Sequence, residues 1–334
     1  MCVPVCKLCW SMSSALLVSI ATIALAQQPS RPAPATDGLC TTTVSLPPVQ
    51  QGGARAGGGG GARGGGAPQP TSAQLPRLVK VRDDVYIIQN VNDVVAEIGQ
   101  FGGNITVYLT DEGAILIDSK NEQMHDDVVA KVKSLTDKPI KYVILTHNHQ
   151  DHSGGAARMQ QIGATLIISR DDRQQMARAG QMGLPQIAYS RNASVVLGGK
   201  EVQLTEYCGH TRGDTVAYLP AARVLVVGDL VTTPDTIPQI VNYGDGGNWT
   251  DMGKTLDAIA GLDFDLMVAG HGPVLTKQQF LDHRAKVARI RERARTLVKE
   301  GRSQEEITQT LLKEFNWGSG PAAGNIAGMI AEFR

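Results

Sequence analysis

The stretch LTHNHQDHSGG, residues 145–155, places three histidines and one aspartate within six positions, and two glycines follow. The whole chain has only seven histidines, so this short segment holds a large share of them. Imidazole and carboxylate groups are the side chains that bind transition metals or carry protons. The apolar run YVILT (142–146) stands directly before the first histidine and is typical of a buried strand. The segment therefore indicates a metal or proton-transfer site at a strand end.

The same arrangement, an apolar strand that runs into a histidine or aspartate, recurs three times further along the chain. The three runs are VQLTEYCG before His210, RVLVVG before Asp229 and LMVAG before His271. A glycine directly precedes each of these residues, which lets backbone approach without a side chain in the way. Because the ends of neighbouring strands lie close together, we expect these residues to converge on the 147–152 segment.

The number of candidate ligands predicts how many metal ions are bound. The candidates are His147, His149, Asp151, His152, His210, Asp229 and His271. One zinc ion takes about four ligands, so seven suit two ions that share a carboxylate and a water. The imidazole majority favours zinc over magnesium or calcium, with iron or manganese as less favoured metals.

The order of strand and helix patterns predicts the fold class. ITVYLT (105–110) and GAILIDS (113–119) are joined by Asp111-Glu112-Gly113, a hairpin signal. Helical and strand patterns then alternate, and a strand-rich stretch followed by helices comes again in the second half. This order predicts an α/β (α+β) fold with two mixed sheets and helices on their outer faces. A single parallel sheet fits less well, because hairpins imply antiparallel pairing.

Four blocks resemble the signature of the metallo-β-lactamase superfamily: THNHQDH (146–152), GHTRGDT (209–215), VGD (227–229) and AGHGP (269–273). The order and spacing of the blocks agree over roughly residues 80–275. The resemblance implies a four-layer αβ/βα sandwich with the site on its rim. It also implies that His147, His149 and His210 hold one metal, that Asp151, His152 and His271 hold the other, and that Asp229 bridges them.

The N-terminal part has the composition of targeting and linker segments. Lys7 precedes the apolar run ALLVSIATIALA (15–26), which is too short for a membrane helix, since that needs roughly 20 residues. It fits a signal peptide over residues 1–26, cleaved before Gln27, although a buried helix is an alternative. Residues 27–76 are rich in glycine and proline and predict a disordered linker. We therefore expect an exported protein, periplasmic or secreted, with no stable membrane span after cleavage.

The remaining chain is long enough for one large domain, which we expect over residues 77–275, with helices over 276–334 packed on it. Acidic and basic residues balance at 32 each, so no nucleic-acid partner is implied; a small-molecule substrate is expected, and the oligomeric state is open. Only Cys40 and Cys208 lie beyond the expected signal peptide, so we expect no disulfide framework, and Cys208 as a small buried residue.

The expected function is an exported zinc hydrolase that cleaves a β-lactam, lactone, ester or thioester, with Asp151 as the catalytic carboxylate. The resemblance leaves the substrate open, because Asp229 is similar to the bridging aspartate of the glyoxalase II and lactonase branches, whereas export fits a β-lactamase. A mononuclear-iron redox enzyme of the same fold and a non-catalytic secreted metal-binding protein are the alternatives.

Other parts of the sequence are expected to lie at the surface of the protein. The Gly-rich segment 99–104 predicts a flap or hairpin turn with Phe101 exposed, and His125 and His283 are expected in solvent. The long segment 231–249 follows Asp229, and we expect it to form a substrate wall that includes Trp249.

Overall fold

Two β-sheets form the centre of the computed structural model, which describes residues 1, 75–92, 94–233 and 236–334. The first sheet has the strand order β1-β2-β3-β4-β5-β6-β7, and the second has the order β13-β12-β11-β10-β9-β8. Each sheet contains antiparallel and parallel pairs, for example β3 with β4 and β4 with β5 in the first. Two mixed sheets confirm the predicted fold class. The expected signal peptide and nearly all of the expected linker lie outside the described residues.

The strands are short, as expected for a twisted sandwich. Those of the first sheet are β1 (Arg77–Arg82), β2 (Val85–Gln89), β3 (Ile105–Thr110), β4 (Gly113–Ile117), β5 (Ile140–Ile144), β6 (Thr165–Ser169) and β7 (Ile187–Tyr189). Those of the second are β8 (Asn192–Leu197), β9 (Lys200–Tyr207), β10 (Asp214–Leu219), β11 (Val224–Val226), β12 (Leu266–Val268) and β13 (Leu275–Thr276). The predicted hairpin joins β3 and β4, where Thr110 pairs with Gly113.

The helices belong to two groups, one for each sheet. The α-helices are α1 (Val95–Phe101), α2 (His125–Lys133), α3 (Gln150–Ser153), α4 (Ala156–Gln161), α5 (Arg170–Arg178), α6 (Trp249–Ala260), α7 (Lys277–Lys299), α8 (Gln304–Phe315) and α9 (Ala323–Phe333). Short 3-10 turns are η1 (Glu122–Met124), η2 (Pro220–Ala222), η3 (Gly228–Leu230), η4 (Tyr243–Asp245) and η5 (Gly320–Ala322). Capping boxes at Thr276 and Ser303 define where α7 and α8 begin.

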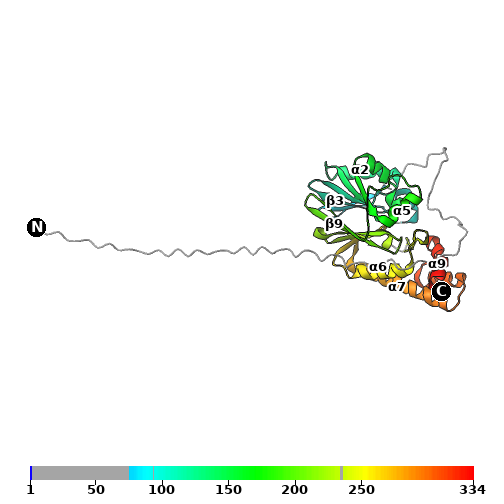
Figure 1. Cartoon of the computed structure of the whole chain (residues 1–334). Helices are drawn as coiled ribbons and strands as arrows, with labels where there is room; N and C mark the ends of the chain where they lie inside the picture. Colours follow the sequence, from blue (N-terminus) through cyan, green and yellow to red (C-terminus); the bar gives the residue numbers. More distant parts are fainter. Residues whose placement is uncertain (2–74, 93, 234–235) are drawn as a thin grey trace. The chain divides into compact units, whose positions relative to one another are not determined.

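The central strands are apolar on both faces because both faces are covered. In β4, Ala114 and Leu116 pack in the cluster beneath the helices of the first sheet, whereas Ile115 and Ile117 pack against the second sheet. Successive side chains of a strand point to opposite faces, so a continuous apolar run is required here. Figure 1 shows the resulting layers, with β3 and β9 between α2 and α5 on one side and α6 and α7 on the other.

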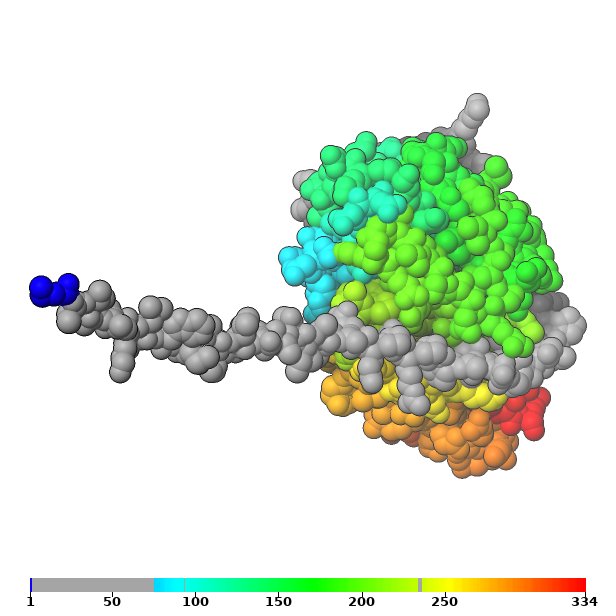
Figure 2. All heavy atoms as spheres, turned by 60° about the vertical axis from the view of Figure 1, so that its left-hand side comes forward, coloured from blue at the N-terminus to red at the C-terminus, as the bar shows by residue number. Residues whose placement is uncertain are grey.

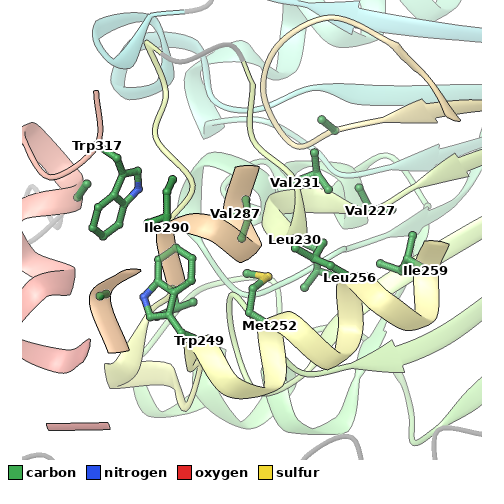
Figure 3. Packing of buried hydrophobic residues seen from close by; sticks show 14 of the residues in the cluster. Val227, Leu230, Val231, Trp249, Met252, Leu256, Ile259, Val287, Ile290 and Trp317 are labelled. Carbon is green, nitrogen blue, oxygen red and sulfur yellow. The ribbon is translucent and has the colours of Figure 1, made fainter. Parts of the chain in front are cut away.

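The second sheet is covered by α6 and by the C-terminal helices α7 to α9. Trp249, Met252 and Leu256 of α6 share one buried cluster with Val287 and Ile290 of α7 (Figure 3). On the surface, α7 lies directly beside α6 (Figure 2). This cluster supports the chain segment that leads from Asp229 to α6, and the geometry of the site depends on it.

Segment 99–104 differs from the expectation. Residues 95–101 form α1, and the side chain of Phe101 is only 1% exposed, so the prediction of an exposed aromatic residue in a turn was wrong. The phenyl ring packs with Ile105 and Leu116 in the cluster of the first sheet, which offsets the weak helix propensity of a Gly-containing segment. Among the residues that the structure describes, no helix is both long and apolar enough to cross a membrane.

Candidate metal centre

All seven predicted ligand residues meet at one edge of the sandwich, each at or just beyond the end of a regular element. His147 follows β5, His149 caps α3, Asp151 and His152 lie in α3, His210 follows β9, Asp229 lies in η3 after β11, and His271 follows β12. The first four come from the first sheet and the last three from the second. They form two groups. Within each group, the candidate ligand atoms all lie within 4.8 Å of one another.

The first group contains His147, His149, His210 and Asp229. His149 Nδ1 lies 3.1 Å from His147 Nε2 and 3.0 Å from His210 Nε2, and His210 Nε2 lies 3.6 Å from Asp229 Oδ2. Ligands at roughly 2.0–2.1 Å from a tetrahedral zinc ion are separated by roughly 3.3 Å. The observed separations lie on both sides of that value. The four ligand atoms are therefore spaced like the corners of a tetrahedron around one ion.

The second group contains Asp151, His152, Asp229 and His271. His271 Nε2 lies 3.2 Å from Asp151 Oδ2, 3.3 Å from Asp229 Oδ1 and 3.3 Å from His152 Nε2. Asp229 thus directs one carboxylate oxygen to each group. Together the two groups are consistent with a dinuclear metal site in which Asp229 is shared.

The outward ring nitrogens of four histidines are held by oxygen atoms. The pairs are His147 Nδ1 with Thr146 Oγ1 (3.1 Å), His149 Nε2 with Asp245 Oδ2 (3.0 Å), His152 Nδ1 with Asp118 Oδ2 (2.8 Å) and His210 Nδ1 with Ile240 O (3.0 Å). An oxygen acceptor on the outward nitrogen places the proton there and leaves the lone pair on the inward nitrogen. This is the arrangement of metal-binding histidines.

Burial and nearby charges shift the pKa values of these residues in both directions. Within the first group, burial acts to lower the pKa of His149, but Asp245 and the other nearby carboxylates raise it. Burial lowers the pKa of His210 to about 4 and holds the pKa of His147 well below its ordinary value, so both rings are neutral at neutral pH. Burial also acts to lower the pKa of His271, but the carboxylates of Asp229 and Asp151 outweigh it and raise that pKa to about 9. Burial acts to raise the pKa of Asp151, and the neighbouring imidazoles lower it to about 2.

These features test whether the residues fit a pair of cations. Ring nitrogens of His147, His149 and His210 face each other at 3.0–3.1 Å, and a cation between them would stabilise this arrangement. Asp229 Oδ1 is buried and faces the ring nitrogens of His152 (3.2 Å) and His271 (3.3 Å), and a cation among these atoms would balance the charge of the carboxylates. The donor set of five imidazoles and two carboxylates fits zinc.

Glycines allow the two sheets to approach at the site. A Cβ atom at Gly270 would lie 2.0 Å from Asp229 Oδ1, and one at Gly103 would lie 2.3 Å from the His152 ring. No side chain is tolerated at such distances without movement of the neighbour. The expectation that Gly270 permits close approach before His271 is therefore met, and Gly103, between α1 and β3, has the same role beside His152.

Three residues of the outer layer were not identified from the sequence: Asp118, Asp245 and Lys120. Asp118 ends the run GAILID, so the rule that found Asp229 also applied to it. Asp245 ends the 3-10 turn η4 and does not follow an apolar strand, so it carries no signal of that kind. Lys120 is 0% exposed; its Nζ donates to Gly103 O (2.7 Å) and Asn90 Oδ1 (2.8 Å), which holds the Gly103 backbone against His152.

Lys120 makes stability depend on pH. Burial lowers its pKa from 10.5 to about 7, so between these values the unfolded chain binds a proton that the folded chain does not. The free energy of unfolding therefore gains at most about 1.4 kcal/mol per pH unit from Lys120 as pH rises through this window. We expect Lys120→Met to lose this contribution in urea unfolding of chelator-treated protein at pH 7.5 and 9.5. An exposed control, Lys313→Met, should keep the wild-type dependence; parallel curves for Lys120→Met would contradict the assignment.

Several side chains that were expected at the surface are buried. Trp249 is 0% exposed in the cluster shared by α6 and the C-terminal helices, so its predicted place in a substrate wall was wrong. His125 is 3% exposed, and His283 is half-buried with its Nε2 3.2 Å from Gln239 Oε1, so neither is solvated as expected. Cys208 is buried, as expected, and it is also disulfide-bonded. In each case tertiary packing, which local sequence does not encode, decides the outcome.

Comparison with known families agrees with this geometry. The sequence profile of the metallo-beta-lactamase superfamily matches residues 98–271, which is more than half of the chain and contains all seven clustered residues. The chain belongs to the metallo-beta-lactamase superfamily. Within it, the chain is 29% identical over 148 residues to the alpha subunit of a 2,4-dinitroanisole O-demethylase from Nocardioides sp. (strain JS1661), covering 43% of this chain and 44% of that protein.

Other members of the superfamily are more distant in sequence. A beta-lactamase-like protein 2 homolog of Caenorhabditis elegans is 26% identical over 258 residues, with 72% of this chain and 82% of that protein covered. A type 2 metallo-beta-lactamase of Elizabethkingia meningoseptica is 24% identical over 162 residues, with 48% and 64% covered. The matched region thus spans less than two thirds of the demethylase subunit and of the type 2 enzyme.

Solved structures share the fold. A metallo-beta-lactamase from Pontibacter korlensis superimposes with a TM-score of 0.56 at 21% identity, covering 64% of this chain and 99% of that one. The DIM-1 metallo-beta-lactamase gives 0.54 at 13% identity, with 64% and 97% covered. These similarities establish the superfamily's sandwich architecture for this chain.

Proposed function

We propose that the chain is a dinuclear zinc hydrolase that cleaves a carbonyl substrate by activating water. The observation that carries the proposal is Asp229, whose two oxygens face two separate groups of imidazoles. His147, His149 and His210 would hold one zinc ion, and Asp151, His152 and His271 the other. A family of hydrolases built on the same sandwich supports the reaction class.

The residues present suit this chemistry. When bound, two zinc ions lower the pKa of the water they share from 15.7 toward about 7 and stabilise the oxyanion that forms at a substrate carbonyl. The two groups contribute only two carboxylates, Asp151 and Asp229, against the four positive charges of the ion pair. Positive charge is therefore left over for water and substrate.

Asp151 is the carboxylate best placed to handle a proton. Its side chain is 21% exposed, against 10% for Asp229, so Asp151 is the more solvent-accessible of the two carboxylates. The neighbouring imidazoles lower the Asp151 pKa to about 2, and the carboxylate is therefore ionised at neutral pH. An ionised, solvent-accessible oxygen accepts a hydrogen bond from the attacking water and then receives its proton.

Removal of metal should abolish turnover. We expect purified protein to hydrolyse at least one member of a panel containing nitrocefin, an acyl-lactone and S-lactoylglutathione. 2,4-Dinitroanisole, an ether without a carbonyl group, is assayed separately because one relative is named for that compound. Turnover should disappear after EDTA treatment and dialysis and return with two equivalents of zinc. Metal content is measured on the same sample.

Each other outcome favours a specific alternative. One iron ion per chain, with no hydrolysis, would support the mononuclear-iron redox enzyme. Two bound zinc ions with no turnover of the whole panel would support a non-catalytic metal-binding protein. Turnover that survives complete metal removal would reject the proposal itself.

We also propose that the protein is exported to the periplasm or secreted. The support is the sequence of residues 1–26, where an apolar run ends in the small-residue site Ala24-Leu25-Ala26. Expression of the full chain in a bacterial host should give a processed protein whose first residue is Gln27, as read by N-terminal sequencing. An intact Met1 in the purified cytoplasmic fraction, with none processed, would contradict export.

A further inference from the structure

Three consecutive residues, 240–242, hold two of the histidines of the first group. Ile240 O accepts a hydrogen bond from His210 Nδ1 (3.0 Å), and Asn242 N donates to His210 O (2.7 Å). Asn242 Nδ2 lies 2.7 Å from His149 Nε2 and donates to Asp245 Oδ2 (2.9 Å), which itself lies 3.0 Å from the same His149 Nε2. The orientation of both imidazoles therefore depends on where the backbone of this segment lies.

The middle residue of that segment is fixed by a side chain from α9, the last helix of the chain. Asn325 Oδ1 accepts from Val241 N (2.8 Å), and Asn325 Nδ2 donates to Val241 O (3.1 Å). The same Oδ1 accepts from Trp249 Nε1 (3.2 Å), and Asn325 is only 7% exposed. One buried amide thus satisfies both backbone groups of Val241, as a neighbouring strand would.

The surrounding contacts keep α9 in place. Trp317 Nε1 donates to Gln239 O (2.8 Å), and the Glu332 carboxylate accepts from Tyr243 Oη (2.8 Å). The rings of Trp249 and Trp317 meet edge to face, with centroids 5.5 Å apart, and Ile290 of α7 lies beside them (Figure 3). Because these side chains are packed and hydrogen-bonded, Asn325 meets Val241 from a fixed position.

We propose that Asn325 is a positioning residue for the three-histidine group and acts through the backbone of Val241. The proposal rests on the dinuclear function proposed above and adds that the C-terminal helix is part of the metal site's outer support. The effect is transmitted in three steps. Asn325 fixes the position of the Val241 backbone, Val241 fixes the positions of Ile240 and Asn242, and these two residues orient the rings of His210 and His149. Outer partners of metal ligands orient the rings and tune affinity, so a defect at Asn325 should reach the metal.

In the second group, another buried asparagine fixes the backbone next to a ligand histidine, and it provides the control. Asn104 Nδ2 donates to Ala269 O (3.0 Å) and Gly272 O (2.9 Å), on either side of His271, and Asn104 is 5% exposed. Asn325 and Asn104 are therefore both buried asparagines that fix backbone next to ligand histidines, but each serves a different group. A general loss of packing would affect both groups alike, whereas positioning is selective.

The experiment compares Asn325→Leu with Asn104→Leu in the full chain. Zinc affinity is measured by competition with a chelator, and the cobalt-loaded protein is examined by proton NMR for exchange-protected imidazole N–H signals. For Asn325→Leu we expect one of the two zinc ions to bind about 10-fold more weakly. We also expect the N–H signal of His210 to be lost or broadened while that of His152 is kept. Asn104→Leu should weaken one ion and keep the His210 signal.

Two further measurements keep the result decisive. Asn325→Asp retains the acceptor for Val241 N and replaces the donor to Val241 O with a carboxylate oxygen, so it tests the same contact if Asn325→Leu does not fold. It should weaken the same ion selectively. Wild-type protein that binds fewer than two ions overturns the proposed function. If the wild-type protein binds two ions and the Asn325 variants keep the same zinc affinities and N–H signals, only the role of Asn325 is overturned.

Discussion

Asp229→Asn is expected to bind one zinc ion instead of two and to lose at least about 100-fold in hydrolysis. In the folded chain one carboxylate oxygen of Asp229 faces His271 at 3.3 Å and the other faces His210 at 3.6 Å. An asparagine side chain has a single oxygen, and its amide nitrogen does not bind a metal. Loss of an outer partner of a ligand costs about 10-fold to 100-fold, and removal of a shared ligand exceeds the upper end of that range.

The matched variant is Asp245→Asn. It makes the same chemical change, a carboxylate to an amide, at a residue that contacts a ligand of the first group but is not itself a ligand. Asp245 accepts from His149 and touches no ligand of the second group. It should keep two ions and lose about 10-fold to 100-fold in the affinity of one of them. Metal content and hydrolysis are measured on the same preparations. Two tightly held ions in Asp229→Asn would show that Asp229 is not shared between the groups.

Gly270→Ala is expected to disrupt the metal site by adding a single methyl group. A Cβ atom at this position would lie 2.0 Å from Asp229 Oδ1 and 2.7 Å from the carbonyl carbon of Gly228. The backbones of residues 228 and 270 are hydrogen-bonded at 2.8 Å, so the chain cannot simply move away. Overpacking of this kind lowers the free energy of unfolding by about 1–3 kcal/mol. Zinc stoichiometry should fall below two, because Asp229 must rotate.

The control for this variant is Gly324→Ala, the same change at the start of α9. No atom lies within 4 Å of a Cβ there, and alanine is favoured over glycine in a helix by up to about 1 kcal/mol. The control should therefore be neutral or more stable in urea unfolding and should bind two ions. Equal effects of the two substitutions would mean that steric contact with Asp229 is not the cause.

The positions of the seven clustered residues were predictable because four of them follow an apolar strand and the other three lie within five positions of the first. Strand ends are a local property of the sequence, and several strand ends of a sandwich meet at one edge. The same reasoning gave the fold class, since the hairpin at Asp111 implied antiparallel pairing within sheets that also contain βα units. The assignment of His210 to one group and of His271 to the other came from the family resemblance, and the structure places them accordingly.

What local patterns did not reveal depends on packing between segments distant in the chain. Trp249 stands in a polar-looking stretch, yet α6 and the C-terminal helices close around it. Lys120 is buried although lysine is rarely buried, because Asn90 and the Gly103 carbonyl supply oxygen acceptors. Asn325, far from every ligand in sequence, contacts the site only through Val241. Each of these roles needs a partner that cannot be read from neighbouring residues.

Both groups of ligands draw on both sheets, and this has a consequence for how the protein assembles. The segment 147–152 comes from one half of the chain, and His210, Asp229 and His271 come from the other. Neither half alone contains a complete set for either ion, so tight binding has to await docking of the halves. Ions bound by these groups would act as cross-links between the sheets. Metal uptake would thus report completed assembly, and a nascent or misassembled chain would be distinguished by its failure to retain metal.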